Sequence, residues 1–166
     1  MKTVLIGLGN PILGDDGVGW KVAENVKEQL TSSPALLARG EGREVDVNCL
    51  SLGGLSLMEH LIGYQRVILV DSFIAEENIG SVHVYKLNDI PNYSAFHITS
   101  VHDTSLQSAL ELGRWMGAIL PDDITVVGIA IKHIVDFSEE LSPPVEEAVP
   151  RATQVVLELL KQFETA

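Results

Sequence analysis

Residues 4–19 have the sequence VLIGLGNPILGDDGVG, which joins a short apolar strand to a glycine-rich turn and then to the start of a helix. A strand that enters such a turn before a helix is typical of phosphate-binding loops in α/β proteins. Here, however, Asp15 and Asp16 lie where the helix is expected to begin. Because two carboxylates repel a phosphate, this loop is expected to bind a cation or an amide.

The dinucleotide fingerprint G-x-G-x-x-G is only partly present in the loop. Gly7 and Gly9 match its first two glycines, but Ile12 occupies the third position. Two like charges about 4 Å apart, at an effective dielectric of about 20, repel each other by roughly 4 kcal/mol. A pyrophosphate beside the aspartate pair would meet repulsion of this order, so the pattern argues against nucleotide binding.

An acidic composition limits the partners of the chain. Its 166 residues include 23 Asp and Glu against 11 Lys and Arg, for a net charge of −12. Such a surface repels nucleic acid and anionic membranes, so neither is expected as a partner. No apolar run approaches the roughly 20 residues of a membrane helix. The single cysteine, Cys49, suits a reducing compartment. We therefore expect a cytoplasmic protein with one domain, residues 1–166.

Apolar runs alternate with helical patterns along the chain. Strands are predicted at 2–7, 44–50, 67–70, 82–85 and 124–129, and helices at 16–30, after Gly54, at 103–118 and at 143–163. This alternation predicts an α/β three-layer sandwich, with a mostly parallel five-stranded sheet flanked by helices. The short link before residues 82–85 predicts an edge strand antiparallel to the third strand. Pro150 is expected to kink the last helix or to restart it.

Polar residues follow several of the predicted strands. Open α/β sheets bind ligands beyond the carboxyl ends of their strands. Asp16 follows the first strand, Asp71 ends the third, and His102, with His97 as an alternative, precedes the third helix. We expect Asp15 to cap the first helix, which leaves Asp16 as the better ligand candidate. Two carboxylates and one imidazole suit a borderline divalent ion such as nickel, zinc or manganese. Three protein ligands leave coordination positions open for water or substrate.

Nucleophilic catalysis has little support in the sequence. No Gly-x-Ser-x-Gly motif occurs, and Cys49 lies alone on a predicted strand, where a core position is expected. His60 and His83 are expected to be packing or surface residues. His133 is a weaker candidate, expected at most to contact the site residues without binding the metal itself.

The loop over residues 7–19 resembles the N-terminal signature of the hydrogenase maturation proteases. These endopeptidases trim the C-terminus of the large subunit of nickel–iron hydrogenases. Three further motifs match in the same order: Gly54-Leu55-Ser56-Leu57-Met58-Glu59, Val70-Asp71-Ser72 and Ser100-Val101-His102-Asp103-Thr104-Ser105-Leu106. The resemblance extends over essentially the whole chain, and the first motif is its most specific part.

The resemblance implies a metal site and its ligands. In that family an acidic residue of the first loop, an Asp at the end of the third strand and a later His bind the metal. By position these are Asp16, Asp71 and His102, and the His-x-x-x-Leu spacing selects His102 over His97. The same three residues are the implied catalytic groups. One departure is residues 128–132, which lack the Glu-Pro pair that family members often carry there.

The resemblance also implies a function. The chain is expected to be a metal-dependent peptidase, of the aspartyl or metallo type, that removes the C-terminal peptide of a hydrogenase large-subunit precursor. Nickel, carried by the precursor after its insertion, is the expected recognition element, and zinc, calcium or cadmium are other ions expected to fit the site. A monomer or weak homodimer is expected. A checkpoint or chaperone that docks on the precursor without cutting it remains an alternative, and a flavodoxin-like module for a small anion is a third.

Overall fold

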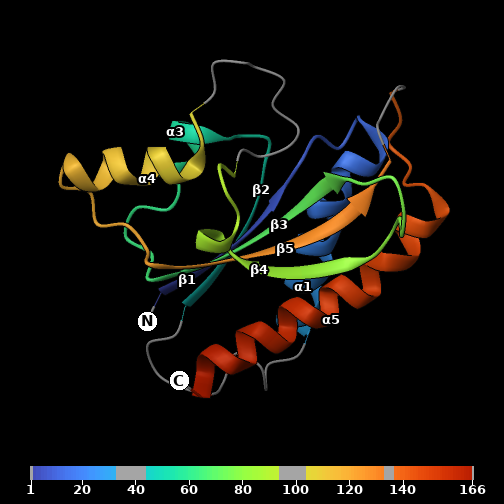
Figure 1. Ribbon diagram of the computed structural model, residues 1–166. Coiled ribbons are helices and arrows are strands. Elements are labelled where there is room, and N and C mark those ends of the chain that lie inside the picture. The colour runs from blue at the N-terminus through green and yellow to red at the C-terminus, as the bar shows by residue number, and fades with distance from the viewer. Residues whose placement is uncertain (1, 33–43, 94–103, 133–136, 166) are drawn as a thin grey trace.

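The computed structural model describes residues 2–32, 44–93, 104–132 and 137–165. Its sheet consists of β1 (Lys2–Leu8), β2 (Glu44–Leu50), β3 (Arg66–Ile74), β4 (Val82–Lys86) and β5 (Asp123–Ile131). The strand order is β2-β1-β3-β5-β4, and all neighbours are parallel except β4 and β5 (Figure 1). The predicted mostly parallel sheet with an antiparallel edge strand is therefore confirmed. The expected partner of β4 was wrong, because β5 lies between β3 and β4.

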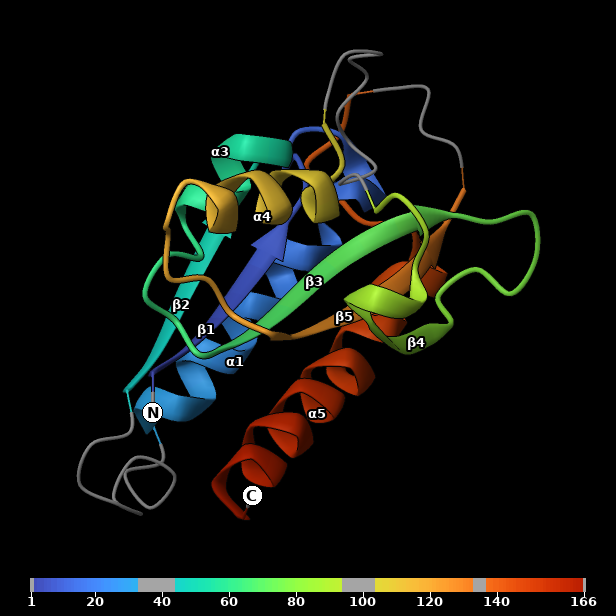
Figure 2. The same ribbon diagram turned by 60° about the vertical axis from the view of Figure 1, so that its left-hand side comes forward.

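Helices cover both faces of this sheet. They are α1 (Val18–Ser32), α3 (Gly54–Glu59), α4 (Leu106–Trp115) and α5 (Pro143–Thr165), with short 3₁₀ helices η1 (Gly14–Gly17) and η2 (Leu87–Asp89). Figure 2 shows α3 and α4 on one side of the sheet and α1 and α5 on the other. Along the described residues, no helix combines the length and apolar character needed to cross a bilayer.

The core is divided by the sheet into two apolar clusters. Leu5 of β1 contributes to the cluster with α1 and α5, whereas Val4 and Ile6 contribute to the cluster with α3 and α4. Successive side chains of a strand point to opposite faces, so a strand covered on both sides is apolar throughout. This explains why the predicted strands are continuous apolar runs.

Several predicted element ends differ from the structure, each for a local reason. α4 is shorter than expected because the Ser105 hydroxyl caps its first turn, accepting from the Ser108 N–H at 3.2 Å, and Gly117 with φ of +88° follows its end. The short helix α3 ends at Glu59, and Ile62 in the turn that follows it is 48% exposed. α5 continues through Pro150 and does not restart, since Val149 and Ala152 are buried in the core on either side of it.

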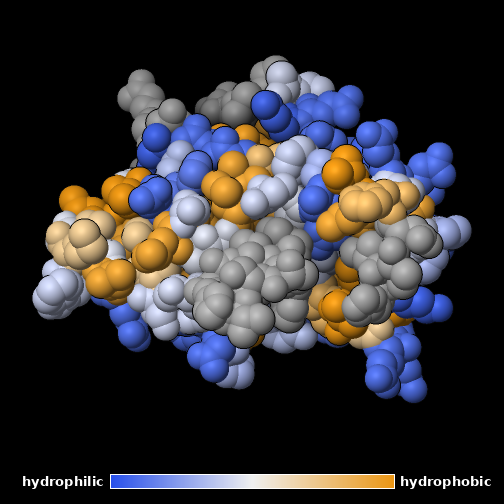
Figure 3. Space-filling model, turned by 90° about the horizontal axis from the view of Figure 1, so that it is seen from above, coloured by the Kyte–Doolittle hydropathy of each residue, from blue (hydrophilic) through white to orange (hydrophobic). Residues whose placement is uncertain are grey.

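One group of exposed apolar side chains lies far from the carboxyl ends of the strands. It consists of Leu112, Trp115, Met116 and Ile119, which are 41–85% exposed. Figure 3 shows apolar residues gathered at the left, where α4 lies in Figure 1. The Gly63 N–H donates to the Ile119 carbonyl at 2.9 Å, which places this group beside the turn that precedes β3. It is therefore at the amino-terminal edge of the sheet.

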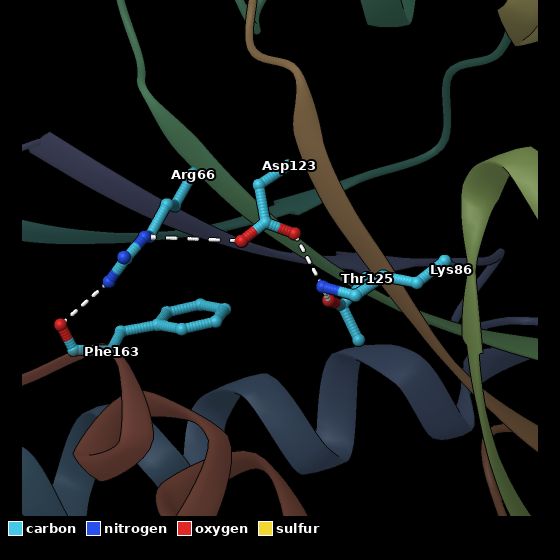
Figure 4. A network of polar contacts seen from close by, with 5 residues as sticks. All are labelled: Arg66, Lys86, Asp123, Thr125 and Phe163. Atoms are coloured by element: carbon cyan, nitrogen blue, oxygen red, sulfur yellow. Dashed lines mark hydrogen bonds and ion pairs between the residues drawn. The ribbon is translucent and has the colours of Figure 1, made fainter. Parts of the chain in front are cut away.

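Arg66, the first residue of β3, holds the C-terminal end of α5. Its guanidinium donates to the Phe163 carbonyl at 2.6 Å and lies 4.7 Å from the centre of the Phe163 ring (Figure 4). Asp123 is 3.9 Å from the same guanidinium and also pairs with Lys86. A cation that binds the last carbonyls of a helix opposes the negative end of its dipole.

Replacing this guanidinium is expected to weaken the fold. Arg66→Met keeps the apolar stem but removes the charged donor to Phe163, so the free energy of unfolding should fall by about 1–3 kcal/mol. Urea denaturation measures the change. Arg151→Met, on the exposed side of α5, is the matched control and should be near neutral. Equal stabilities of the two variants would contradict the proposed anchoring.

Candidate functional site

The loop after β1 turns back on itself and buries Asp16. Gly9 has φ of +132°, and a Cβ at this position would overlap the Asp16 carbonyl oxygen. Only glycine adopts this conformation without strain at such close approach. One Asp16 carboxylate oxygen accepts the Asn10 N–H at 2.7 Å, which closes the loop, and the side chain is 3% exposed.

Asp71 lies within β3 and is also buried. We predicted that the strand ends at Asp71, but β3 continues to Ile74 because its pairing with β5 extends to Ile131. The Asp71 side chain is 1% exposed. One of its oxygens accepts the Ser72 N–H at 2.9 Å, and the other accepts the Tyr93 hydroxyl at 2.7 Å.

Ser72 connects the two carboxylates. Its hydroxyl donates to Asp16 at 3.1 Å, while its N–H donates to Asp71. The structure therefore brings Asp16 and Asp71 together at the carboxyl ends of β1 and β3, where the topology predicted a site. Buried carboxylates in proteins are commonly paired with a cation or coordinate a metal ion. This arrangement suits a divalent cation or acid–base chemistry.

Tyr93 is the buried donor beside Asp71. Burial raises the pKa of its phenol well above the usual 10.0, and the charge of Asp71 and their hydrogen bond raise it further. The phenol therefore stays protonated over the physiological range and keeps donating to Asp71. A protonated donor held in this way orients the carboxylate.

The third predicted ligand cannot be placed with the other two. His102, its alternative His97 and also His133 lie outside the described residues. Among the residues that the structure describes, no group of three His, Cys, Asp or Glu side chains is arranged to hold a metal ion. The two carboxylates that the structure does describe, Asp16 and Asp71, are oxygen ligands of the kind that bind divalent cations. The complete ligand set stays a prediction.

Asp15 has a different task from the one predicted. The N-cap residue of η1 is Leu13, and no side chain caps this helix, so Asp15 does not have the predicted capping role. Its carboxylate instead accepts the Ser142 N–H at 2.6 Å and the Ser142 hydroxyl at 2.7 Å, just before α5. Of the two adjacent aspartates, Asp15 therefore makes a tertiary contact with Ser142, and Asp16 belongs to the buried cluster.

Sequence reasoning missed two residues of the cluster. Ser72 adjoins Asp71 in a quoted motif, so its position was a usable signal, but no role was assigned to it. Tyr93 lies in a segment of weak periodicity, and nothing in the local sequence indicates its contact with Asp71. Cys49 is partly buried against the core, and burial raises the pKa of its thiol, in keeping with a packing role. His60 and His83 are exposed, as expected for surface residues.

Comparisons with known proteins identify a family of similar sequence and fold. A protein-family model described as "HycI: Hydrogenase maturation protease" matches residues 20–159 of the chain. Protein FrxA of Pyrococcus furiosus is 30% identical over 153 residues, which cover 92% of this chain and 100% of that protein. The hydrogenase 2 maturation protease of Escherichia coli is 24% identical over 163 residues, covering 98% and 92%. The structure of the hydrogenase maturating endopeptidase HybD from E. coli is similar in fold, with a TM-score of 0.70 at 22% identity over 98% of this chain and 93% of that one.

The raised pKa of Tyr93 predicts a stability change at alkaline pH. Because the native pKa exceeds the unfolded value of 10.0, the native state keeps a proton that the unfolded chain releases above that pH. The free energy of unfolding should therefore fall as pH rises past 10, by up to about 1.4 kcal/mol per unit from this group. Tyr93→Phe should flatten that slope in urea titrations, whereas Tyr85→Phe, at an exposed position, should not. A slope unchanged in Tyr93→Phe would refute the assignment.

Proposed function

The chain belongs to the hydrogenase maturation protease family, and from that premise we propose that it is an endopeptidase that removes the C-terminal peptide of a nickel–iron hydrogenase large-subunit precursor. The observation that supports this proposal most is the buried pair Asp16 and Asp71, joined through Ser72. Such a pair is suited to a metal-bearing peptide substrate, and the family supplies the class of substrate.

The proposal assigns the ligands as the sequence predicted them. Asp16 and Asp71 provide oxygen donors, and His102 provides a nitrogen donor, to the nickel that the precursor carries. The matched residues of the family begin at residue 20, so they include Asp71 and His102, whereas the assignment of Asp16 is supported by its loop and by its contact with Ser72. A metal held by these residues would supply Lewis acidity, which could polarise the scissile carbonyl or activate a water.

The residues around the pair are proposed to hold each carboxylate in a working orientation. The Asn10 N–H and the Ser72 hydroxyl fix Asp16, while the Ser72 N–H and the Tyr93 phenol fix Asp71. One carboxylate then takes a proton from the attacking water, which adds to the scissile carbonyl carbon. That proton passes to the leaving amine as the peptide bond breaks.

Isosteric replacement of either aspartate tests the assignment. Asp16→Asn and Asp71→Asn keep side-chain size but remove the charge, so the processing rate should fall at least about 100-fold, as for a lost acid–base group. Intact-mass analysis of the precursor follows the reaction. Asp46→Asn, which removes a carboxylate on β2 bound to Tyr64 and Lys2, is the control and should process normally. Wild-type rates in both site variants would show the ligand assignment to be wrong.

Nickel removal tests whether the metal is recognised on the substrate. Nickel-loaded precursor should lose its C-terminal peptide, whereas nickel-free precursor and reactions with His102→Ala should show no change of mass. His60→Ala, at an exposed position of the chain, is the matched control. Complex formation with unchanged mass in the wild-type reaction would favour the checkpoint alternative, and cleavage of nickel-free precursor would reject nickel-dependent recognition.

A further inference from the structure

A pocket of about 280 Å³ opens directly beside the buried carboxylates. It shares Asp71 and Ser72 with the site and is also lined by residues of β4 and β5 and by the segment around η2. Its other walls are mainly apolar: Phe73, Tyr85, Ile90, Pro91, Tyr93 and Val126. Pockets for whole small molecules occupy about 300–1,000 Å³, so this volume suits one large side chain.

The chemistry of the pocket favours an apolar occupant. Three of its walls are aromatic rings, and in the described part of the chain its lining contains no basic residue. Both oxygens of Asp71 already accept hydrogen bonds, from Ser72 and from Tyr93. Asp89, the other acid of the lining, is exposed at the surface. What the pocket offers to a ligand is therefore chiefly ring and aliphatic surface.

Gly128 keeps the base of the pocket open. It pairs with Asp71 in the sheet register, and a Cβ at this position would lie 3.0 and 3.2 Å from atoms of the Phe73 ring. The Phe73 ring packs edge-on against His83 at 5.5 Å, and His83 stacks on Tyr85 at 6.0 Å. These contacts make an ordered aromatic wall, and Tyr85 is still 40% exposed and within reach of a ligand.

We propose that this pocket binds an apolar side chain of the precursor, on one of the two residues that flank the scissile bond. The inference rests on the proposed function. The pocket is continuous with the site, because Asp71 is both a carboxylate of the site and part of the pocket wall. A substrate side chain bound in the pocket would therefore place the substrate backbone next to Asp71. The pocket thereby selects the substrate residue and positions the peptide bond for hydrolysis.

Substrate variants test the proposal directly. The cut is located by intact mass in the reaction of wild-type protein with unaltered nickel-loaded precursor, and each flanking residue is then changed to Ala, Leu, Phe, Glu or Lys. At one of the two positions, kcat/KM for Leu or Phe should exceed that for Ala by about 10-fold or more, as hydrophobic pockets discriminate. Glu and Lys should be cut more slowly than Leu.

Protein variants connect this preference to the pocket. Tyr85→Ala removes an exposed wall and should reduce the preference for Leu or Phe over Ala, while Gly128→Val fills the base and should shift the preference towards Ala. Val84→Ala, the neighbouring residue of β4 and not part of the lining, is the matched control and should keep the wild-type preference. Circular dichroism of each variant confirms that it is folded.

The outcomes separate this inference from the proposed function. Equal rates for Ala, Leu and Phe at both positions, with cleavage of the unaltered precursor intact, would overturn the pocket alone. A preference for Lys over Leu would overturn it as well, because the acids would then select a cation. No cleavage of the unaltered precursor by the wild-type protein would overturn the proposed function and this inference with it.

Discussion

Close packing of the first loop on the sheet is the constraint on which the rest of the site depends. A Cβ at Gly19 would overlap the carbonyl oxygens of Leu8 and Val70, so only glycine lets α1 begin against the ends of β1 and β3. Gly9 permits the same closeness between the turn and Asp16. Because η1 lies so near the sheet, Asp16 reaches Ser72 and joins the carboxylate of the neighbouring strand. A larger residue at either glycine would move η1 outwards and separate the two acids.

Burial gives the two acids their chemical character. Asp16 and Asp71 are both almost fully enclosed, and each is held by protein donors. Hydrogen bonds from backbone N–H groups and hydroxyls satisfy the oxygens without adding a positive charge, so the cluster retains an attraction for a cation. Carboxylates that are held by these uncharged donors are consistent with the proposal that the metal arrives with the substrate.

The adjacent aspartates show how one dipeptide can serve two purposes. Asp15 binds Ser142 at the start of α5, across 127 residues of sequence, and so fixes the position of that helix relative to the loop. Asp16, one residue later, turns towards the sheet. Sequence reasoning gave the two aspartates different roles but assigned Asp15 to a local helix cap, because local patterns contain no information about a partner that distant. The same limitation explains why Tyr93 was missed, since it lies 22 residues after Asp71 and on the far side of β4 in the sequence.

The order of apolar runs was enough to establish the α/β architecture, since a strand buried on both faces must be apolar throughout, as in residues 67–70. The glycines and acids of residues 7–19, with the three later motifs, were likewise enough to indicate the family. The same loop and the end of the third predicted strand made Asp16 and Asp71 predicted site residues. The tertiary structure alone decided that Ser72 links these acids, that β5 separates β4 from β3, and that an apolar pocket adjoins Asp71. These features arise from side chains and strands that are distant in sequence, and their contacts depend on packing in three dimensions, which periodicity along the chain does not encode.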